Sequence, residues 1–247
     1  MSWLGLLLIG LGISDLVCSL LRRPRIAELA GAMSVLALGP VAGLTSAVEL
    51  ASVAVVAGIV VVWGRSVSYA FGSGPPALPL TVLGVALGAA VIASGAAPAA
   101  GGLLGDWLGS AGLDALADLD PDRALLLAGA VLVQLSTGNV VVRLVLAASG
   151  TSNPVRMGRD APEPALKGGR LLGPMERLII LGLGLAGEVT AAGIVIAAKG
   201  LLRFPELQAT RREQPRGPGI HAVTEYFLVG SFVSWLVSLA SLALLAA

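Results

Sequence analysis

Three charged residues are evenly spaced in an otherwise apolar stretch of the chain. Glu188 follows Arg177 by eleven residues, and Lys199 follows Glu188 by eleven more. Because eleven residues turn an α-helix through about 1100°, roughly 20° past three full turns, the three side chains would share one stripe of a single helix. A carboxyl group between two cations could bind a small cation or carry a proton.

A single helix through Leu178–Ala198 would place this carboxyl group deep in a bilayer. At a rise of about 1.5 Å per residue, Arg177 and Lys199 would lie about 33 Å apart, close to the hydrocarbon thickness of about 30 Å. An acid near the midplane costs at least about 2.5 kcal/mol, so Glu188 is the first candidate for a functional residue. The alternative is a protonated packing residue between two cations that extend to the interfaces.

The composition is that of a membrane protein. Hydrophobic residues make up 56% of the 247 residues and charged residues 13%, with a mean hydropathy of +0.90, whereas about 25% of a soluble domain is charged. Cys18 and His221 are each the only residue of their type. The chain therefore has too few cysteines and histidines for us to expect an intrachain disulfide, a zinc site or a Ser-His-Asp triad. We expect an all-α polytopic bundle, with residues 1–247 as one integral membrane domain and without metal, cofactor or nucleic-acid partner.

The apolar runs predict about seven membrane-spanning helices. Ile26–Trp63 would be about 57 Å long as one helix, and Gly39, Pro40 and Gly43 interrupt it, so we expect two short spans there. Six spans remain if Ile26–Leu38 lies in the interface instead. The five clear runs are Trp3–Leu21, Ala77–Pro98, Ala124–Ala148, Leu178–Ala198 and Ala222–Leu245.

The charges of the connecting segments predict an orientation. Segment 99–123 is acidic and is expected outside, whereas segment 149–176 is basic and is expected in the cytoplasm. Segment 199–221 is also basic, so both flanks of Leu178–Ala198 look cytoplasmic. Either that run crosses fully and leaves a basic external loop, which we favour, or it enters the membrane and returns at its glycines. The membrane would then be the cytoplasmic membrane of a bacterium.

Further polar residues fall within the predicted spans. Asp15 and Glu49 add two acids, and Asn139 and Arg143 add polarity to Ala124–Ala148, with Arg143 able to pair with Glu188 or Glu49. Each such group needs a partner or water, which favours a functional interior. The last span carries hydroxyls on one face, and we favour helix packing over a polar pathway for them. These hydroxyls belong to Thr224, Ser231, Ser234, Ser238 and Ser241.

Three local patterns predict structure rather than chemistry. Gly182, Gly184 and Gly187 form G-x-G-x-x-G, but a dinucleotide fold needs alternating strands and helices, so we expect close helix packing at Gly182 instead. Asp120 before Pro121 is typical of a helix start. Trp3 and Trp63 fall at predicted span ends, as interfacial tryptophans do, whereas Trp235 falls mid-span and is expected to pack between helices.

From Lys167 onward, the order of several short motifs resembles a bacterial integral-membrane family catalogued as domain of unknown function 3307. The resemblance covers roughly the last third of the chain and implies a membrane location but no activity. Family members carry an N-terminal His, an Asp four residues later and then a Gln; Asp15 fits that Asp, but Leu11 and Ser19 replace the other two. The motifs are Gly169–Gly173, Glu176-Arg177, Ala197–Lys199, Arg203-Phe204, Glu225-Tyr226, Gly230-Ser231 and Ser234.

Three functions fit these residues. We favour a protein that binds or moves a small polar or charged species, with Glu188 as the central group and Arg177, Lys199 and Arg203 holding anionic headgroups or gating the ends. A lipid-headgroup enzyme at the cytoplasmic interface is the second, because carboxylates beside arginines can bind phosphate and act as a base. Its cluster would be Glu176, Arg170, Arg203 and Glu225.

The third function is a non-catalytic scaffold that binds a membrane-protein partner, or a second copy of itself, through its small-residue faces. Anionic lipids are expected partners in all three cases, because basic residues at the cytoplasmic surface attract them.

Overall fold

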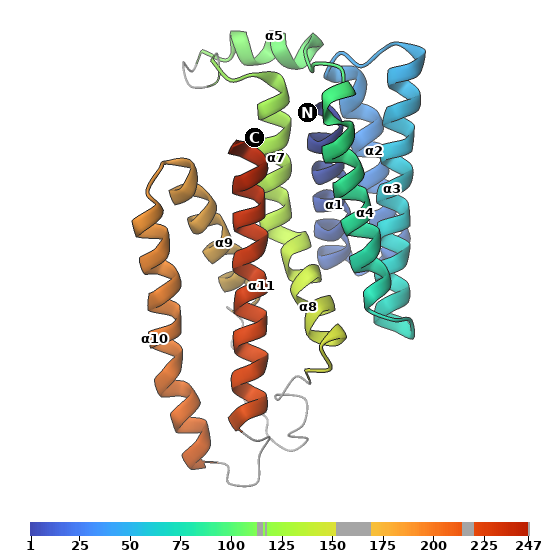
Figure 1. The fold of residues 1–247 in the computed structure, drawn as a ribbon. Coiled ribbons are helices and arrows are strands. Elements are labelled where there is room, and N and C mark those ends of the chain that lie inside the picture. The colour runs from blue at the N-terminus through green and yellow to red at the C-terminus, as the bar shows by residue number, and fades with distance from the viewer. Residues whose placement is uncertain (113–115, 117, 152–168, 214–219, 247) are drawn as a thin grey trace. The chain divides into compact units, whose positions relative to one another are not determined.

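The computed structural model describes the chain except for residues 113–115, 117, 152–168, 214–219 and 247, and the side chains of 169–170 and 202–223. All regular elements in the described part are helices (Figure 1). The predicted all-α membrane bundle is therefore confirmed, although five helices, not seven, are long and apolar enough to cross a bilayer. They are Ser2–Leu21, Ala47–Gly72, Ala77–Ala96, Pro121–Ala148 and Thr224–Ala246.

The chain divides into two compact units, Met1–Val140 and Val141–Ala247. In unit 1 the central helix is α1, which packs mainly against three others. Glycines allow the close approach: a Cβ atom at Gly12 would lie 2.5 Å from the Cβ of Leu132. The helices of this core are α1 (Ser2–Leu21), α2 (Pro24–Val41), α3 (Ala47–Gly72) and α7 (Pro121–Leu132).

The long apolar stretch after α1 is divided into two helices, as predicted, but of these only α3 is among the described helices that are long and apolar enough to cross a bilayer, so the two short spans expected there are not confirmed. The break comes at Gly43, whose φ of 83° is a left-handed value that glycine adopts without strain, while Pro40 lies inside α2. α3 then begins with a capping box, in which Ser46 and Glu49 bond to each other's backbone N–H groups. Since α3 continues to Gly72, Trp63 is fully buried within it, and its predicted interfacial position is wrong.

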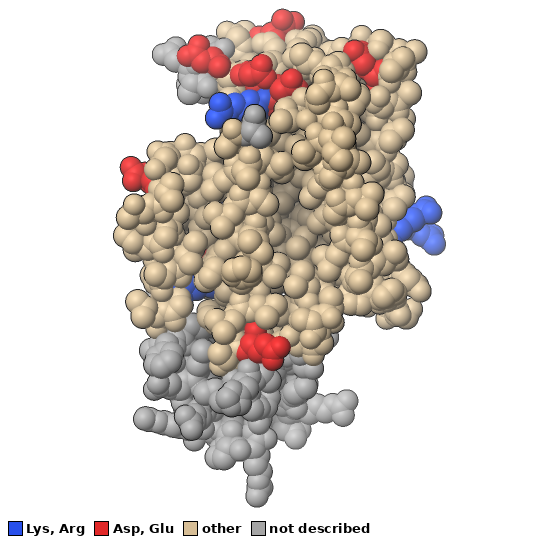
Figure 2. Space-filling model, viewed as in Figure 1, with Lys and Arg blue, Asp and Glu red and all other residues tan. Residues whose placement is uncertain are grey.

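The remaining helices of unit 1 are more exposed. α4 (Ala77–Ala93) continues into a 3₁₀ turn, and α5 (Gly102–Ser110) lies within the acidic segment that was expected to be a loop. Acidic side chains gather around α5, and the flank turned to the viewer is largely uncharged (Figure 2), as surface in contact with lipid should be. Asp120 accepts bonds from the N–H groups of Asp122 and Arg123, which confirms the predicted start of α7.

Unit 2 contains the main correction to the sequence analysis. Leu178–Ala198 is not one helix: α9 (Gly169–Leu185) ends, the chain reverses at Gly187, and α10 (Val189–Glu213) returns. Gly187 has φ 78°, which ends the helix in a left-handed turn. α9 therefore begins inside the predicted basic segment 149–176, and α10 extends through most of segment 199–221.

The α9–α10 hairpin removes the conflict in the predicted orientation. Its two arms run antiparallel, and α11 (Ile220–Ala246) packs against α9 (Figure 1). The start of α9 and the end of α10 consequently lie on the same side of the turn at Gly187. The alternative in which the run returns at its glycines is the correct one, and the full crossing is wrong.

Candidate functional site

Each unit contains a buried polar cluster, and the first is centred on Asp15 of α1. Asp15 is buried, and only 6% of the residue is exposed. The indole Nε1 of Trp63 lies 3.2 Å from each carboxylate oxygen and donates to both. The hydroxyl of Thr137 also approaches this carboxylate. We call Asp15, Trp63 and Thr137 the Asp15 cluster. In the part of the chain that is described, Trp63 is the hydrogen-bond donor to the acid and the buried Thr137 hydroxyl has no hydrogen-bond partner, so both neighbours of the acid are neutral.

A π-helical turn between α7 and α8 (Gly138–Ala148) supplies the third member of this cluster. The turn, Val133–Thr137, carries Gln134, Ser136 and Thr137, all of which are buried. Ser136 donates to the carbonyl oxygen of Gly12 at 2.7 Å, which ties the turn to α1. Such turns insert one residue into a helix and are frequent at functional sites. The turn thereby directs polar side chains towards the helix that carries Asp15.

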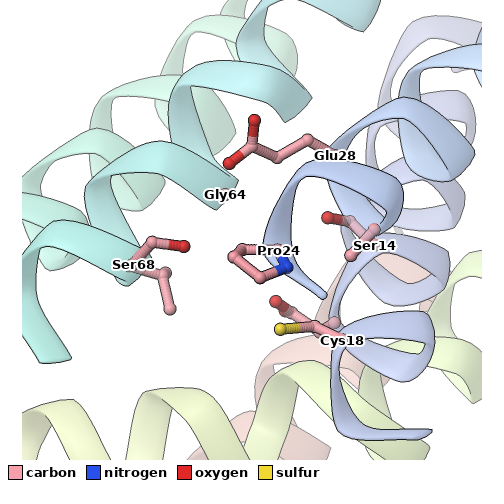
Figure 3. Close-up of a pocket in the computed structure, with 9 residues that line it drawn as sticks. Ser14, Cys18, Pro24, Glu28, Gly64 and Ser68 are labelled. Atoms are coloured by element: carbon pink, nitrogen blue, oxygen red, sulfur yellow. The ribbon is translucent and has the colours of Figure 1, made fainter. Parts of the chain in front are cut away.

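A small pocket lies beside the Asp15 cluster. Its cavity of about 20 Å³ has room for one water-sized molecule. α1 contributes Ser14 and Cys18 to its wall, α2 contributes Pro24 and Glu28, and α3 contributes Gly64 and Ser68 (Figure 3). Asp15 also lines it, together with Ala27 and Val67.

Glu28 is a second buried acid on the wall of this pocket, and the sequence analysis missed it. The residue is 8% exposed, and its Oε2 lies 3.5 Å from Nε of Arg65. The Arg65 side chain is 76% exposed, so the pair joins the pocket to the surface of α3. Gly64 makes room for it, because a Cβ atom there would lie 2.7 Å from Cγ of Glu28. The signal available in the sequence was the adjacent pair Gly64 and Arg65, a small residue followed by a cation that could accommodate an acid such as Glu28.

The second cluster ties the three long helices of unit 2 together. Glu176 of α9 is buried and forms an ion pair with Lys199 of α10. Its other oxygen accepts a hydrogen bond from Nε1 of Trp235 at 2.9 Å. The hairpin creates this contact, since it brings together residues 23 positions apart in the chain. The predicted packing of Trp235 between helices is confirmed.

Arg177 completes what we call the Glu176 cluster: Glu176, Arg177, Lys199, Ser234 and Trp235. Its guanidinium donates to the Ser234 hydroxyl at 3.2 Å, and the residue is 1% exposed. Arg177 therefore does not extend to an interface, as one alternative had it.

The serines of α11 follow the same pattern. The hydroxyl of Ser238 donates to the Arg177 carbonyl oxygen at 3.3 Å. All four serines of the predicted face are buried, which agrees with helix packing. They are Ser231, Ser234, Ser238 and Ser241.

Glu188, the first candidate from the sequence, belongs to neither cluster. It lies exposed in the turn between α9 and α10, where its backbone N–H donates to the carbonyl oxygen of Leu183 at 2.8 Å. The eleven-residue stripe does not form, because the chain reverses at the residue that was to be its centre. Lys199 consequently lies beside Glu176, the residue that directly precedes Arg177. Lys199 and Arg177 are therefore not separated by the thickness of a bilayer.

The structure places the other predicted residues apart from the two clusters. Glu49 caps α3, which corrects its assignment to a span interior. Close packing of Gly182 is also wrong, since a Cβ atom built there would meet nothing within 4 Å; a Cβ atom at Gly184 would meet Leu242 of α11 instead. Arg170 and Arg203 lie on α9 and α10, with side chains outside the described part.

The remaining sequence candidates lie on helix surfaces. Arg143 is exposed and Asn139 half-buried on α8, while Glu225 is exposed and Tyr226 half-buried near the start of α11. Among the side chains that the structure describes, no group of three or more His, Cys, Asp and Glu residues could hold a metal ion.

Comparisons with known proteins do not extend this picture. No family model matches the chain, and neither the curated proteins nor the solved structures contain a match to it. The resemblance to the family of unknown function therefore stays an expectation, and the functional argument rests on the two clusters.

Proposed function

We propose that the protein binds a small cation at Asp15 and passes it through its helical bundle. The observation that carries this proposal is a buried carboxylate whose hydrogen-bond donor in the described part of the chain, the indole of Trp63, is neutral. A carboxylate in an apolar interior is costly unless a positive charge compensates it. A proton or a small cation would supply that charge, so this site has a chemical reason to bind one.

The position of Asp15 along α1 supports a role in transfer. Asp15 lies six residues before Leu21, the last residue of α1, which is about 9 Å along the helix. Three arginines, Arg22, Arg23 and Arg25, follow directly. By the positive-inside rule this end faces the cytoplasm, and the acidic segment with α5 faces outside. The carboxylate would thus lie within the hydrocarbon but near the cytoplasmic side of a bacterial membrane.

The pocket limits the size of the species. A cavity of about 20 Å³ admits one water-sized molecule, which excludes sugars, amino acids and other larger solutes at this point. The site therefore favours a proton or a small inorganic cation. Asp15 takes the role that the sequence analysis gave to Glu188.

Flux measurements in proteoliposomes test this function. The wild-type protein would be reconstituted and assayed with pH-, sodium- and potassium-sensitive dyes under an imposed membrane potential. We expect flux of at least one cation in the wild type and its loss in Asp15→Asn. Glu188→Gln is the matched control, because that acid lies in an exposed turn. Equal flux in Asp15→Asn and wild type would refute the role of Asp15.

The hairpin favours a second candidate, the lipid-headgroup enzyme. A full crossing would have separated Arg170 from Arg203 and Glu225, whereas the hairpin brings α10 back alongside α9, and the end of α10 and the start of α11 lie at one end of unit 2 (Figure 1). Incubating the protein with phosphatidylglycerol and cardiolipin vesicles, followed by mass spectrometry of the lipids, tests this candidate. Unchanged headgroups would remove it.

A further inference from the structure

Two buried acids line the same small pocket, and they come from different helices. Asp15 belongs to α1 and Glu28 to α2, and the residues are 6% and 8% exposed. Asp15 is held by neutral donors, whereas Glu28 reaches the exposed Arg65. Asp15 therefore faces the interior of unit 1, whereas Glu28 connects the pocket to the surface of unit 1 through Arg65.

The hydroxyl of Ser14 provides a second, independent indication of a ligand. Ser14 is 2% exposed and lines the same pocket as the two acids (Figure 3). Its Oγ faces α3, since a Cβ atom at Gly64 would lie 3.6 Å from it. Among the described residues, no hydrogen-bond partner is found for this hydroxyl, although buried hydroxyls are normally bonded. A water-sized molecule in the pocket would have Ser14, Asp15 and Glu28 as polar neighbours, which is enough to hold it.

From this arrangement we propose that the transported cation is the proton, and that Glu28 relays it between Asp15 and the aqueous phase at Arg65. The inference rests on the proposed function of Asp15. A proton leaves the Asp15 carboxyl oxygen for a water molecule in the pocket, and that water gives a proton to a Glu28 carboxylate oxygen. Glu28 then releases a proton to solvent and regains its ion pair with Arg65. Asp15 takes up its next proton from the opposite side of the membrane, so each acid gains and loses one proton in a cycle and the cycle balances.

The pocket suits a proton better than a metal cation. Metal cations need several oxygen ligands at once, and the described part of the chain contains no group of three acidic, His or Cys side chains that could supply them. Trp63 also occupies both oxygens of Asp15, which leaves little room for metal coordination. A proton needs only one carboxylate oxygen and a neighbouring water.

Gly64 offers a way to test Glu28 without removing its carboxyl group. Gly64→Ala would place a methyl group 2.7 Å from Cγ of Glu28, so the side chain must leave its path to Arg65. Gly58→Ala, on the same helix, is the matched control, because nothing lies within 4 Å of a Cβ atom there.

The experiment measures proton flux into proteoliposomes that contain a pH-sensitive dye, driven by a potassium diffusion potential. We expect flux in the wild type, a fall of at least about tenfold in Glu28→Gln, and a several-fold fall in Gly64→Ala. Flux in Gly58→Ala should match the wild type. If Glu28→Gln does not fold, Gly64→Ala against Gly58→Ala still decides the question.

Other outcomes separate the inference from the function on which it rests. Sodium or potassium flux without proton flux, abolished by Asp15→Asn, would overturn the proton relay and keep the function of Asp15. Proton flux that requires Asp15 but is unchanged in both Glu28→Gln and Gly64→Ala would overturn the role of Glu28 alone. Absence of any cation flux in the wild type would overturn both.

Discussion

Each unit of the protein buries a carboxylate that accepts a hydrogen bond from a tryptophan indole. In unit 1, Trp63 donates to Asp15, and in unit 2, Trp235 donates to Glu176. The two acids differ in what else they meet: Glu176 forms an ion pair with Lys199, whereas the described partners of Asp15 are neutral. Glu176 is therefore satisfied within the protein and holds a hairpin together, while Asp15 lacks such a counter-charge and is the acid that we propose binds a cation.

The two units also differ in how their helices are joined. Unit 1 packs α1 through glycines, so that backbones approach closely over an apolar surface. Unit 2 joins α9, α10 and α11 through ion pairs and hydrogen bonds among buried polar side chains. Apolar packing around a single uncompensated acid suits a binding site, and a closed polar network suits a structural tie.

The largest loss of stability is expected from removing Lys199, the cation that forms the ion pair with Glu176 in unit 2. Lys199→Met would leave Glu176 buried without its counter-charge, which costs about 3 kcal/mol of unfolding free energy. Denaturation with SDS in mixed micelles measures this loss. The double variant Lys199→Met with Glu176→Gln should recover part of it. Equal stability of Lys199→Met and wild type would show that Glu176 is not held by this pair.

The glycine packing of unit 1 should produce the next largest effect. Gly12→Ala would force apart α1 and α7 at Leu132, at a cost of about 1 to 3 kcal/mol. Gly88→Ala in α4 is the matched control, because its Cβ atom would meet nothing within 4 Å. There the change should stabilise the helix by up to about 1 kcal/mol. The same denaturation assay distinguishes the two, and loss of stability in both would argue against this packing.

The two tryptophans allow the acids to be compared directly. Trp63→Phe removes the indole donor of Asp15 and should cost about 2 kcal/mol, because the carboxylate keeps few other described partners. Trp235→Phe should cost about 1 kcal/mol, since Lys199 remains beside Glu176. Cation flux should change in Trp63→Phe and stay unchanged in Trp235→Phe. A reversed order of either quantity would contradict the assignment of roles.

The smallest effect is expected at Glu188. Its side chain is exposed in the hairpin turn, so Glu188→Gln should change the unfolding free energy by less than about 0.5 kcal/mol and leave flux intact. Both assays described above apply. A large loss of flux would contradict this assignment and would support the continuous helix, with Glu188 at its centre, that the sequence predicted.

The sequence predicts the helical class, the split of the first long apolar stretch, the start of α7 and the packed serine face of α11. These features depend on local composition and on caps, which sequence patterns report well. The hairpin was missed because the eleven-residue spacing fits a continuous helix equally well. Gly187 and the basic residues on both flanks were the signals for a reversal, and the glycine pattern was assigned to packing instead.

The clusters could not be predicted in full, because they depend on contacts between distant residues. Glu176 and Lys199 meet only once the chain reverses, and Trp63 reaches Asp15 only because α3 extends to Gly72. Glu49 was assigned to a span although Ser46 three residues earlier is typical of a capping box. Asp15 was recognised as an intramembrane acid, but its neutral surroundings appear only in the folded bundle.

Infrared difference spectroscopy of the protein in bilayers tests most directly whether Asp15, and not Glu176, is the acid that exchanges a charge. On transfer from H₂O to D₂O, a carboxyl group that carries a proton shifts its C=O stretching band, whereas an ionised carboxylate in an ion pair does not. We predict a shifting carboxyl band that disappears in Asp15→Asn and persists in Glu176→Gln. A band that persists in Asp15→Asn and disappears in Glu176→Gln would contradict the account.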